Sequence, residues 1–257
     1  MKNFDYSKSD ISKALTDVGI TTDDNIFVHS NIGYFGKMEN AENKNDYCRE
    51  FLESVLDVIG INGTLVVPTF SYSFCNNEVY DKIKTDSVCG IFSEYIRKKS
   101  NSSRSDDPNF SIAAIGKNAG LFTKDCAAYS FGKNSFWERF HRKDGKICNF
   151  NLDSSSTFIH YVEKSLNVEY RYDKPFSGTS IINGKQVELT FFHFVYDLNK
   201  KSNAPYFKKF DHKVGKLGMK KTSQLGKGQI ISINSKDVFE IIKKELVTNP
   251  DFLIVGN

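Results

Sequence analysis

Asn25-Ile-Phe-Val-His29 and Gly63-Thr-Leu-Val-Val-Pro68 are the two short apolar runs that decide the fold class. Between them, residues 46–59 place apolar side chains at the three- and four-residue spacing of one helix face, and Gly60 ends that pattern. Strand, helix, glycine turn and strand make one βαβ unit, whose crossover is right-handed in almost all proteins. The stretch therefore predicts two parallel strands joined by a helix.

The same alternation continues on both sides of this unit. Apolar spacing predicts helices at 9–18, 90–99, 135–140 and 156–166, and buried strands at 110–115 and 146–150. Ser9 or Asp10 is the expected cap of the first helix. The pattern predicts an α/β fold, with a three-layer α/β/α core and a mainly parallel central sheet. In such folds ligands bind at the carboxyl ends of the strands.

After Pro175 the sequence changes character. Asn183-Gly184 lies between two strand-like runs and is typical of a type I′ hairpin turn. Residues 200–227 are rich in Lys and Gly and poorly periodic, which indicates a long surface excursion; a strand at 229–233 and a helix at 235–246, capped by Ser235, follow. We expect one domain over 1–257, with 176–230 as an antiparallel, loop-rich elaboration whose free edge could pair in a homodimer.

Composition narrows the functional classes. Of the 257 residues, 39% are hydrophobic, which is typical of a folded globular chain. The 35 Lys and Arg exceed the 31 Asp and Glu by only four and are scattered, which argues against a nucleic-acid partner. The five cysteines form no C-x-x-C pair, and no run approaches the roughly 18 apolar residues of a membrane span. A cytoplasmic location with reduced thiols is expected.

Common catalytic motifs are absent from the sequence. It has no G-x-G-x-x-G, G-x-x-x-x-G-K-[ST], H-E-x-x-H or G-x-S-x-G. No motif therefore indicates a dinucleotide-binding protein, a P-loop NTPase, a zincin or an ordinary serine hydrolase. Polar residues at strand ends remain. His160 and Glu163 share one helix face at i, i+3, so the carboxylate can orient the imidazole. Asp107, beside Asp106, is a second carboxylate that could tune a histidine. Ordinary helix residues and a surface turn are the alternative interpretations.

Six segments in register resemble a known family. They are Phe27-Val-His-Ser30, Gly63-Thr-Leu-Val-Val-Pro-Thr69, Arg104-Ser-Asp-Asp-Pro-Asn-Phe-Ser-Ile-Ala-Ala-Ile-Gly116, Phe131-Gly-Lys-Asn-Ser135, Asp153-Ser-Ser-Ser-Thr-Phe-Ile-His160-Tyr-Val-Glu163 and Glu169-Tyr-Arg-Tyr172. Together they resemble the aminoglycoside 3-N-acetyltransferase family over about residues 25–175. The resemblance implies acetyl-CoA as co-substrate and direct transfer of the acetyl group to a primary amine, with no acyl-enzyme.

One departure from the family bears on mechanism and substrate. Resistance enzymes of the family typically read His-Pro-Thr-His-Ser where this chain reads Asp107-Pro-Asn-Phe110-Ser, so Phe110 replaces the usual catalytic histidine. Because Phe cannot take a proton, His160 becomes the expected general base. The slightly basic charge favours a phosphate-bearing acceptor, so we expect a nucleotide-linked amino or dideoxy-amino sugar of surface polysaccharide biosynthesis. The alternatives are an aminoglycoside acceptor, and a non-catalytic ligand- or partner-binding relative.

The candidate site is expected to bind two small molecules, acetyl-CoA and the acceptor. His29, Asp107 and His160 also have the ligand chemistry of zinc, although a metal is not the favoured interpretation. The N-terminus of the helix after Asn43 is a possible place for CoA phosphates. The candidate residues are His160, Asp107 and Glu163 for catalysis, Ser30, Asn31, Gly33, Thr69 and Ser71 for acetyl-CoA, and His29, Asp153 and Arg171 for the acceptor.

Overall fold

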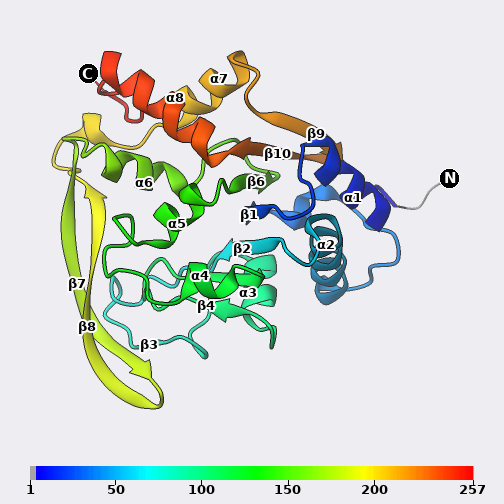
Figure 1. Cartoon of the computed structure of the whole chain (residues 1–257), viewed down its shortest axis with the longest axis horizontal. Coiled ribbons are helices and arrows are strands. Elements are labelled where there is room, and N and C mark those ends of the chain that lie inside the picture. The colour runs from blue at the N-terminus through cyan, green and yellow to red at the C-terminus, as the bar shows by residue number, and fades with distance from the viewer. Residues whose placement is uncertain (1–3, 257) are drawn as a thin grey trace.

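A seven-stranded sheet forms the centre of the computed structural model, which describes residues 4–256 (Figure 1). Its strand order is β4-β5-β2-β1-β6-β10-β9. β1 pairs in parallel with both β2 and β6, while β5 and β10 are antiparallel to their neighbours, so five of the seven strands run in one direction. The bounds are β1 Asn25–Ser30, β2 Thr64–Pro68, β4 Ser103–Arg104, β5 Ile112–Gly116, β6 Lys146–Phe150, β9 Lys221–Leu225 and β10 Gly228–Asn234.

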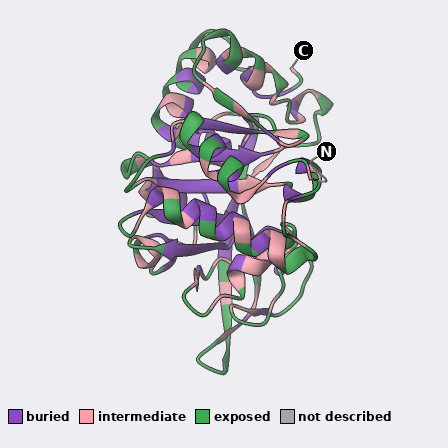
Figure 2. Ribbon diagram, turned by 90° about the vertical axis from the view of Figure 1, so that its right-hand side faces the viewer, coloured by how far each residue is buried: buried purple, intermediate pink, exposed green. Residues whose placement is uncertain are grey.

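Helices cover both faces of this sheet, because side chains alternate between the faces along each strand. In β1, Ile26 and Val28 join one hydrophobic core and Phe27 joins the other. The first core is closed by α1 Lys8–Asp17, α2 Lys44–Ile59 and α3 Ile91–Arg97, and the second by α4 Ala119–Thr123, α5 Phe136–Arg142, α6 Phe158–Ser165, α7 Lys208–Lys216 and α8 Ser235–Thr248. The strands are buried between them (Figure 2). The predicted α/β class with its mainly parallel sheet is confirmed.

A long hairpin leaves the body of the molecule (Figures 1 and 2). It consists of β7 Arg171–Ile182 and β8 Lys185–Tyr196, and the short strand β3 Tyr80–Asp81 pairs with β7 in parallel. Asn183 and Gly184 have φ of 51° and 77°, the left-handed conformation that a type I′ turn requires. The predicted hairpin is therefore present, and it begins at Arg171, earlier than the expected elaboration.

The Lys-rich segment is more ordered than its sequence indicated. Residues 200–227 contain the 3-10 helix η2 Lys201–Asn203, α7 and β9. Helix α7 buries only Phe210 and Val214, so its apolar signal is too short to be recognised. Two caps also differ from the predicted ones by one to three residues, since Ser7 caps α1 and Asn234 caps α8. No helix within residues 4–256 is long and apolar enough to cross a membrane.

Candidate active site

His160 lies on the first turn of α6, the helix that follows the carboxyl end of β6. The loop between β6 and α6 is fixed by the buried Asn149 amide, which donates to the carbonyls of Asp153 at 2.5 Å and Ser155 at 2.9 Å. Only 20% of the His160 side chain is exposed. Its ring meets the edge of Phe131, with centroids 5.3 Å apart, and lies 5.8 Å from Phe207. Aromatic packing therefore holds the imidazole in place.

A buried carboxylate orients His160. Oε2 of Glu163 lies 3.0 Å from His160 Nδ1, and the Glu163 side chain is fully buried. Arg171 donates to the same oxygen and to the Phe194 carbonyl, and its guanidinium lies over the Tyr196 ring at 4.2 Å. Hydroxyls of Tyr170 and Tyr196 donate to Oε1 at 3.0 and 3.2 Å. The charge of Glu163 is thus fully compensated.

This arrangement changes the role expected of Arg171. The residue is a predicted acceptor-binding group, but its side chain is only 4% exposed and is engaged by Glu163 and Phe194. It can position the carboxylate but has no free edge for a ligand.

Burial and the Arg171 charge lower the pKa of His160, and the hydrogen bond to Glu163 only partly opposes them. The imidazole is therefore neutral at physiological pH. Nδ1 lies between Glu163 Oε2, at 3.0 Å, and Nη1 of Arg171, at 2.7 Å, so this nitrogen is fully engaged and Nε2 is the ring nitrogen left to meet a substrate. A neutral histidine with one nitrogen held by a carboxylate is the arrangement that general-base catalysis needs.

His29 comes from the end of β1 and adjoins the same site. Its Nε2 lies 3.2 Å from Thr157 Oγ1, at the start of α6, and its ring meets Phe27 edge to face at 4.8 Å. Burial lowers the pKa of His29 to about 4, and the contact with the Asn149 side chain only partly opposes this effect. His29 is thus a neutral polar group, suited to hydrogen bonding.

Asp107 belongs to a different polar chain. It accepts hydrogen bonds from the Ser130 hydroxyl and from the Phe110 amide, the latter at 2.8 Å. Ser130 Oγ lies 2.8 Å from His193 Nδ1, and the Asn109 amide lies 2.6 Å from His193 Nε2. The predicted contact of Asp107 with His160 is not present in the structure.

Two aromatic rings separate these polar groups. Phe110 lies 5.0 Å from the His193 ring and 5.1 Å from Phe131, which in turn meets His160. Phe110 therefore fills the space between the two histidines with apolar surface.

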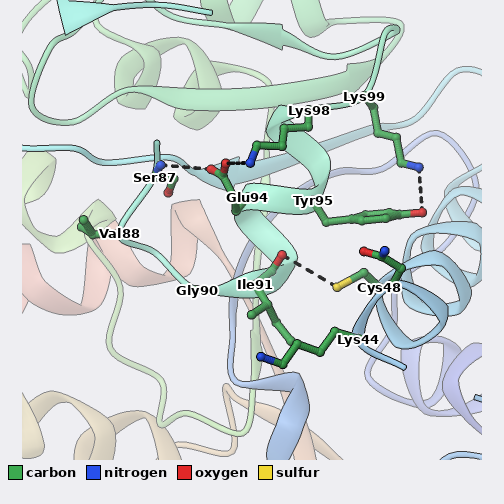
Figure 3. Close-up of a pocket in the computed structure, with 11 residues that line it drawn as sticks. Lys44, Cys48, Ser87, Val88, Gly90, Ile91, Glu94, Tyr95, Lys98 and Lys99 are labelled. Atoms are coloured by element: carbon green, nitrogen blue, oxygen red, sulfur yellow. Dashed lines mark hydrogen bonds and ion pairs between the residues drawn. The ribbon is translucent and has the colours of Figure 1, made fainter. Parts of the chain in front are cut away.

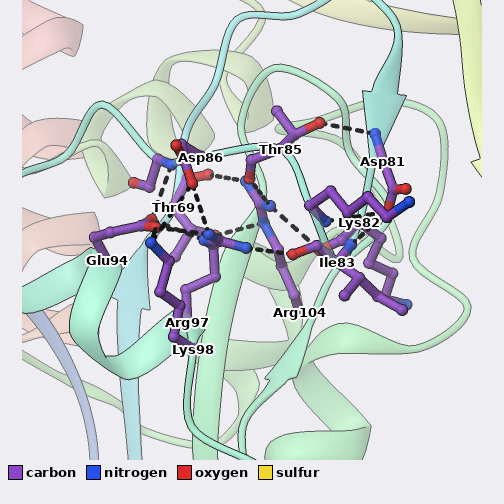
Figure 4. A network of polar contacts seen from close by, with 12 residues as sticks. Thr69, Asp81, Lys82, Ile83, Thr85, Asp86, Glu94, Arg97, Lys98 and Arg104 are labelled. Atoms are coloured by element: carbon purple, nitrogen blue, oxygen red, sulfur yellow. Dashed lines mark hydrogen bonds and ion pairs between the residues drawn. The ribbon is translucent and has the colours of Figure 1, made fainter.

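Two of the residues predicted to contact acetyl-CoA have structural partners instead. The buried Arg104 guanidinium donates to the Thr69 carbonyl at 2.7 Å and to the Thr69 hydroxyl at 3.2 Å (Figure 4). Ser71 Oγ donates to the Pro108 carbonyl at 2.8 Å and lies 2.9 Å from Ser73 Oγ. Thr69 is fully buried and Ser71 is nearly so, which leaves neither free to meet a co-substrate.

The loop after β1 remains open to a ligand. Asn31 and Gly33 are exposed, and they begin the 3-10 helix η1 Ile32–Phe35. The Ser30 hydroxyl is buried without a hydrogen-bond partner among residues 4–256. Asp153 is also exposed, at the carboxyl end of the neighbouring strand β6. These four predicted residues are at the expected edge of the sheet.

In the part of the chain that the structure describes, no three His, Cys, Asp or Glu side chains come together in a group that could hold a metal ion. Of the three candidates, Asp107 does not adjoin His160, and Glu163 already occupies Nδ1 of that ring.

Several residues of the site were not among the catalytic and binding residues predicted from the sequence. Tyr170 and Tyr196 bind Glu163, and Ser130, Asn109 and His193 form the chain to Asp107. Tyr170 lies in Glu169-Tyr-Arg-Tyr172, so its proximity to a family motif was an available signal. No spacing rule brings Ser130 to His193, 63 residues apart in sequence.

Comparison with known proteins supports the resemblance. The family model described as aminoglycoside 3-N-acetyltransferase matches residues 27–246. No curated protein matches the chain significantly.

Solved structures share the fold. The aminoglycoside acetyltransferase AAC(3)-Xa has a TM-score of 0.81 at 17% identity, with 93% of this chain and 92% of that chain covered. AAC-IIIb with CoASH has a TM-score of 0.79 at 16% identity, covering 93% and 96%, and sisomicin-bound AAC-VIa 0.81 at 19%, covering 95% and 98%. The family match confirms the expected class, an acyl-CoA-dependent N-acetyltransferase with acetyl-CoA as co-substrate. The chain therefore belongs to the aminoglycoside 3-N-acetyltransferase family.

Proposed function

We propose that this chain acts as one domain that transfers the acetyl group of acetyl-CoA to a primary amine of an aminoglycoside, with His160 Nε2 as general base. The observation that carries the proposal is the pairing of His160 Nδ1 with the buried Glu163 carboxylate, at 3.0 Å. Glu163, Arg171 and the two tyrosines orient the imidazole and do not themselves meet the substrate.

The reaction is a direct acyl transfer. His160 Nε2 takes a proton from the acceptor ammonium, and the free amine attacks the thioester carbonyl carbon. The carbonyl oxygen gathers negative charge in the tetrahedral intermediate, and backbone N–H groups of the loop at residues 30–33 are the candidate donors to it. The C–S bond then breaks, the CoA sulfur leaves with the proton returned by the imidazolium, and the former amine nitrogen gives its extra proton to solvent. No residue is acylated, and the products are an amide, CoA thiol and one proton.

The lowered pKa of His160 supports this role, since an imidazole that is neutral at physiological pH can accept a proton at once. His29, also neutral, can hydrogen-bond to the acceptor or to the thioester from the neighbouring strand. Asp153 is an exposed carboxylate at the same edge of the sheet and can attract a second ammonium of the acceptor.

The comparisons favour an aminoglycoside over the nucleotide-linked sugar that the sequence alone suggested, because the matched family and the most similar solved structures carry that description. Neither a nucleotide sugar nor polysaccharide biosynthesis has support from them. One observation keeps the nucleotide-linked acceptor as a second candidate, namely the net charge of +4, which does not favour a polycationic ligand.

A substrate comparison decides between them. The protein is supplied with acetyl-CoA and either an aminoglycoside carrying a free 3-amino group or a nucleoside-diphosphate amino sugar, and kcat/KM is measured by thiol release. We expect the aminoglycoside to give the higher value by more than about tenfold. A higher value for the nucleotide-linked sugar reverses the acceptor assignment. No thiol release with any amine refutes the enzymatic function.

A further inference from the structure

A cavity of about 820 Å³ lies between the tip of the β7–β8 hairpin and the body of the molecule. The turn residues Asn183 and Gly184 form one wall, and the end of α3 with strand β4 forms another. The hairpin is extended (Figure 1), and its other end starts at Arg171, beside His160. About 35 Å of strand separate that end from the tip. The cavity is therefore distinct from the candidate active site.

Positive charge is concentrated around this cavity. Six basic and two acidic side chains line it, although the whole chain has a net charge of only +4. Both acids are engaged by neighbouring groups. Asp106 pairs with Lys82 at 2.8 Å, and Asp81 accepts the backbone N–H groups of Ile83 and Lys84 at 2.9 and 3.1 Å. Such an excess of positive charge in a cavity favours an anionic ligand.

Arg104 contributes a buried charge that no carboxylate compensates. The residue is only 5% exposed, and its guanidinium donates to the carbonyls of Thr69 at 2.7 Å and Thr85 at 2.5 Å (Figure 4). Within residues 4–256, all of its hydrogen-bond acceptors are neutral carbonyl or hydroxyl oxygens. Because a guanidinium stays protonated, this charge lies in the cavity wall without a counterion.

Two other cations of the wall are already paired. Arg97 contacts Asp86 at 2.9 Å and Glu94 at 2.6 Å (Figure 4), and Lys98 lies 2.7 Å from Glu94 (Figure 3). Burial opposes the ionisation of Glu94, but the hydrogen bonds from Arg97 and Lys98 outweigh it and lower the pKa of this carboxyl to about 2. Neither cation is therefore needed for a ligand.

Three polar groups of the cavity have unused hydrogen-bonding capacity. Lys84 is exposed, and its amino group makes no ion pair or hydrogen bond to any other described residue. Lys99 Nζ donates to the Tyr95 hydroxyl at 2.7 Å (Figure 3), a neutral acceptor that leaves the lysine charge uncompensated. The Ser102 hydroxyl is buried and has no hydrogen-bond partner in the part of the chain that the structure describes. Two ammonium groups and a hydroxyl are thus available to an anion.

The size and the apolar part of the cavity indicate the class of ligand. Its volume is within the roughly 300–1,000 Å³ of sites that bind small molecules. Ile83 is 81% exposed and Ile182 is 39% exposed, and both line the cavity from different elements. A diphosphate group offers several negative charges and many acceptor oxygens in a small volume, which suits lysine ammonium groups.

We infer that this cavity binds a small molecule through a diphosphate group, with Lys84 and Lys99 on the phosphate oxygens and the Ser102 hydroxyl hydrogen-bonded to them. The buried charge of Arg104 stabilises the anion from the cavity wall. The two exposed isoleucines contact an apolar substituent of the diphosphate. This site does not depend on the acetyl transfer proposed for His160.

Lys84 is the residue whose substitution tests this site. Lys98 and Lys99 also line the neighbouring cavity between α2 and α3, which measures about 630 Å³, whereas Lys84 does not (Figure 3). Lys244 supplies a matched control, because it is exposed on α8 and its amino group likewise has no partner among residues 4–256. Lys84→Gln and Lys244→Gln therefore remove the same charge from two different places.

The test measures binding of inorganic pyrophosphate by isothermal titration calorimetry in a phosphate-free buffer. We expect Lys84→Gln to raise the Kd roughly tenfold, the loss of about one charge-assisted contact, and Lys244→Gln to stay within about twofold of wild type. Saturating CoA is expected to leave the Kd for pyrophosphate unchanged. Circular dichroism and thermal melting establish that both variants fold.

A second ligand, butyl diphosphate, separates the two sources of a diphosphate group. Tighter binding than pyrophosphate, lost in Ile83→Ser, supports an organic diphosphate as the ligand. Equal Kd values for the two ligands, both raised by Lys84→Gln, support free pyrophosphate.

Four results overturn the site: no binding of pyrophosphate to wild type, an unchanged Kd in Lys84→Gln, an equal loss in Lys244→Gln, or displacement of pyrophosphate by CoA. Pyrophosphate binding that depends on Lys84 in a protein that acetylates no amine supports this site and refutes the proposed function. Acetyl transfer by a protein that does not bind pyrophosphate supports the function and overturns the site.

Discussion

Nδ1 of His160 lies 3.0 Å from Oε2 of Glu163, a carboxylate that is fully buried and that also accepts a hydrogen bond from Arg171. The pair is three residues apart on α6, so the helix itself sets its geometry. Arg171 comes from β7, and its hold on Glu163 ties the start of the hairpin to the candidate base.

The ionisation of His160 is the first test. Burial and the Arg171 charge lower its pKa from the ordinary value of 6.5, so the ring is expected to remain neutral at pH 6.5. An NMR titration of the His160 ring protons, assigned by comparison with His160→Gln, measures this directly. A midpoint at or above 6.5 would contradict the described environment.

The pH dependence of stability tests Glu163. Burial raises its pKa, but the His160 hydrogen bond and the Arg171 charge outweigh burial and lower it below the unfolded value of 4.5. A carboxyl whose folded pKa is depressed contributes stability above the unfolded pKa, and this contribution is lost as the pH falls through the folded pKa.

The window for that measurement is therefore below pH 4.5. We expect the free energy of unfolding in urea to fall more steeply between pH 5.5 and pH 3 for wild type than for Glu163→Gln. Glu163→Gln is also expected to be less stable by about 3 kcal/mol at pH 7, because Arg171 loses its buried partner. Equal pH slopes for the two proteins would argue against an ionised Glu163.

Arg104 is a structural cation with no place in the proposed chemistry. Its guanidinium donates to the carbonyls of Thr85 at 2.5 Å and Thr69 at 2.7 Å (Figure 4). It also donates to Ser111 Oγ at 3.1 Å. Arg104→Leu removes these buried charge-assisted hydrogen bonds, leaves the Thr85 carbonyl without its guanidinium donor, and is expected to cost about 3 kcal/mol or more of unfolding free energy. Arg49→Leu, which removes an exposed ion pair, is the control and should cost under about 1 kcal/mol. Similar losses in the two variants would be inconsistent with the network.

Ser130 joins Asp107 to His193, and its removal should uncouple them. In Ser130→Ala the buried His193 Nδ1 loses its partner, so we expect a loss of about 1–3 kcal/mol in chemical unfolding. The exposed pair of Ser177 and Thr190 on the hairpin offers the comparison, because Ser177→Ala is expected to change stability by under about 0.5 kcal/mol. If Ser130→Ala has the unfolding free energy of wild type, the hydrogen bonds that join Asp107, Ser130 and His193 contribute nothing to stability.

The sequence predicted the centre of the fold well, for physical reasons. Strands β2 and β6 lie at the predicted residues, because each directly follows a glycine, Gly63 or Gly145, and is rich in apolar side chains. Helix α7 and strand β9 were not predicted, since each buries too few apolar side chains to create a periodic signal.

The sequence could predict the candidate site only where the interacting residues are close together along the chain. His160 and Glu163 share a helix turn, so their spacing revealed the pair. The roles of Arg171, Thr69 and Ser71 depend on which strand passes which loop, and their polar groups are engaged by distant partners. Asp107 likewise pairs with Ser130, 23 residues away, and not with the predicted histidine.

The central claim is that His160 is the base in acetyl transfer to an amine. The most direct measurement is the rate of thiol release from acetyl-CoA with an aminoglycoside acceptor, for wild type, His160→Gln and the control His212→Gln, whose side chain is exposed on α7. The account predicts that His160→Gln lowers kcat by about 10²- to 10⁴-fold with an unchanged KM for acetyl-CoA, while His212→Gln matches wild type. A His160→Gln enzyme with wild-type kcat would contradict it.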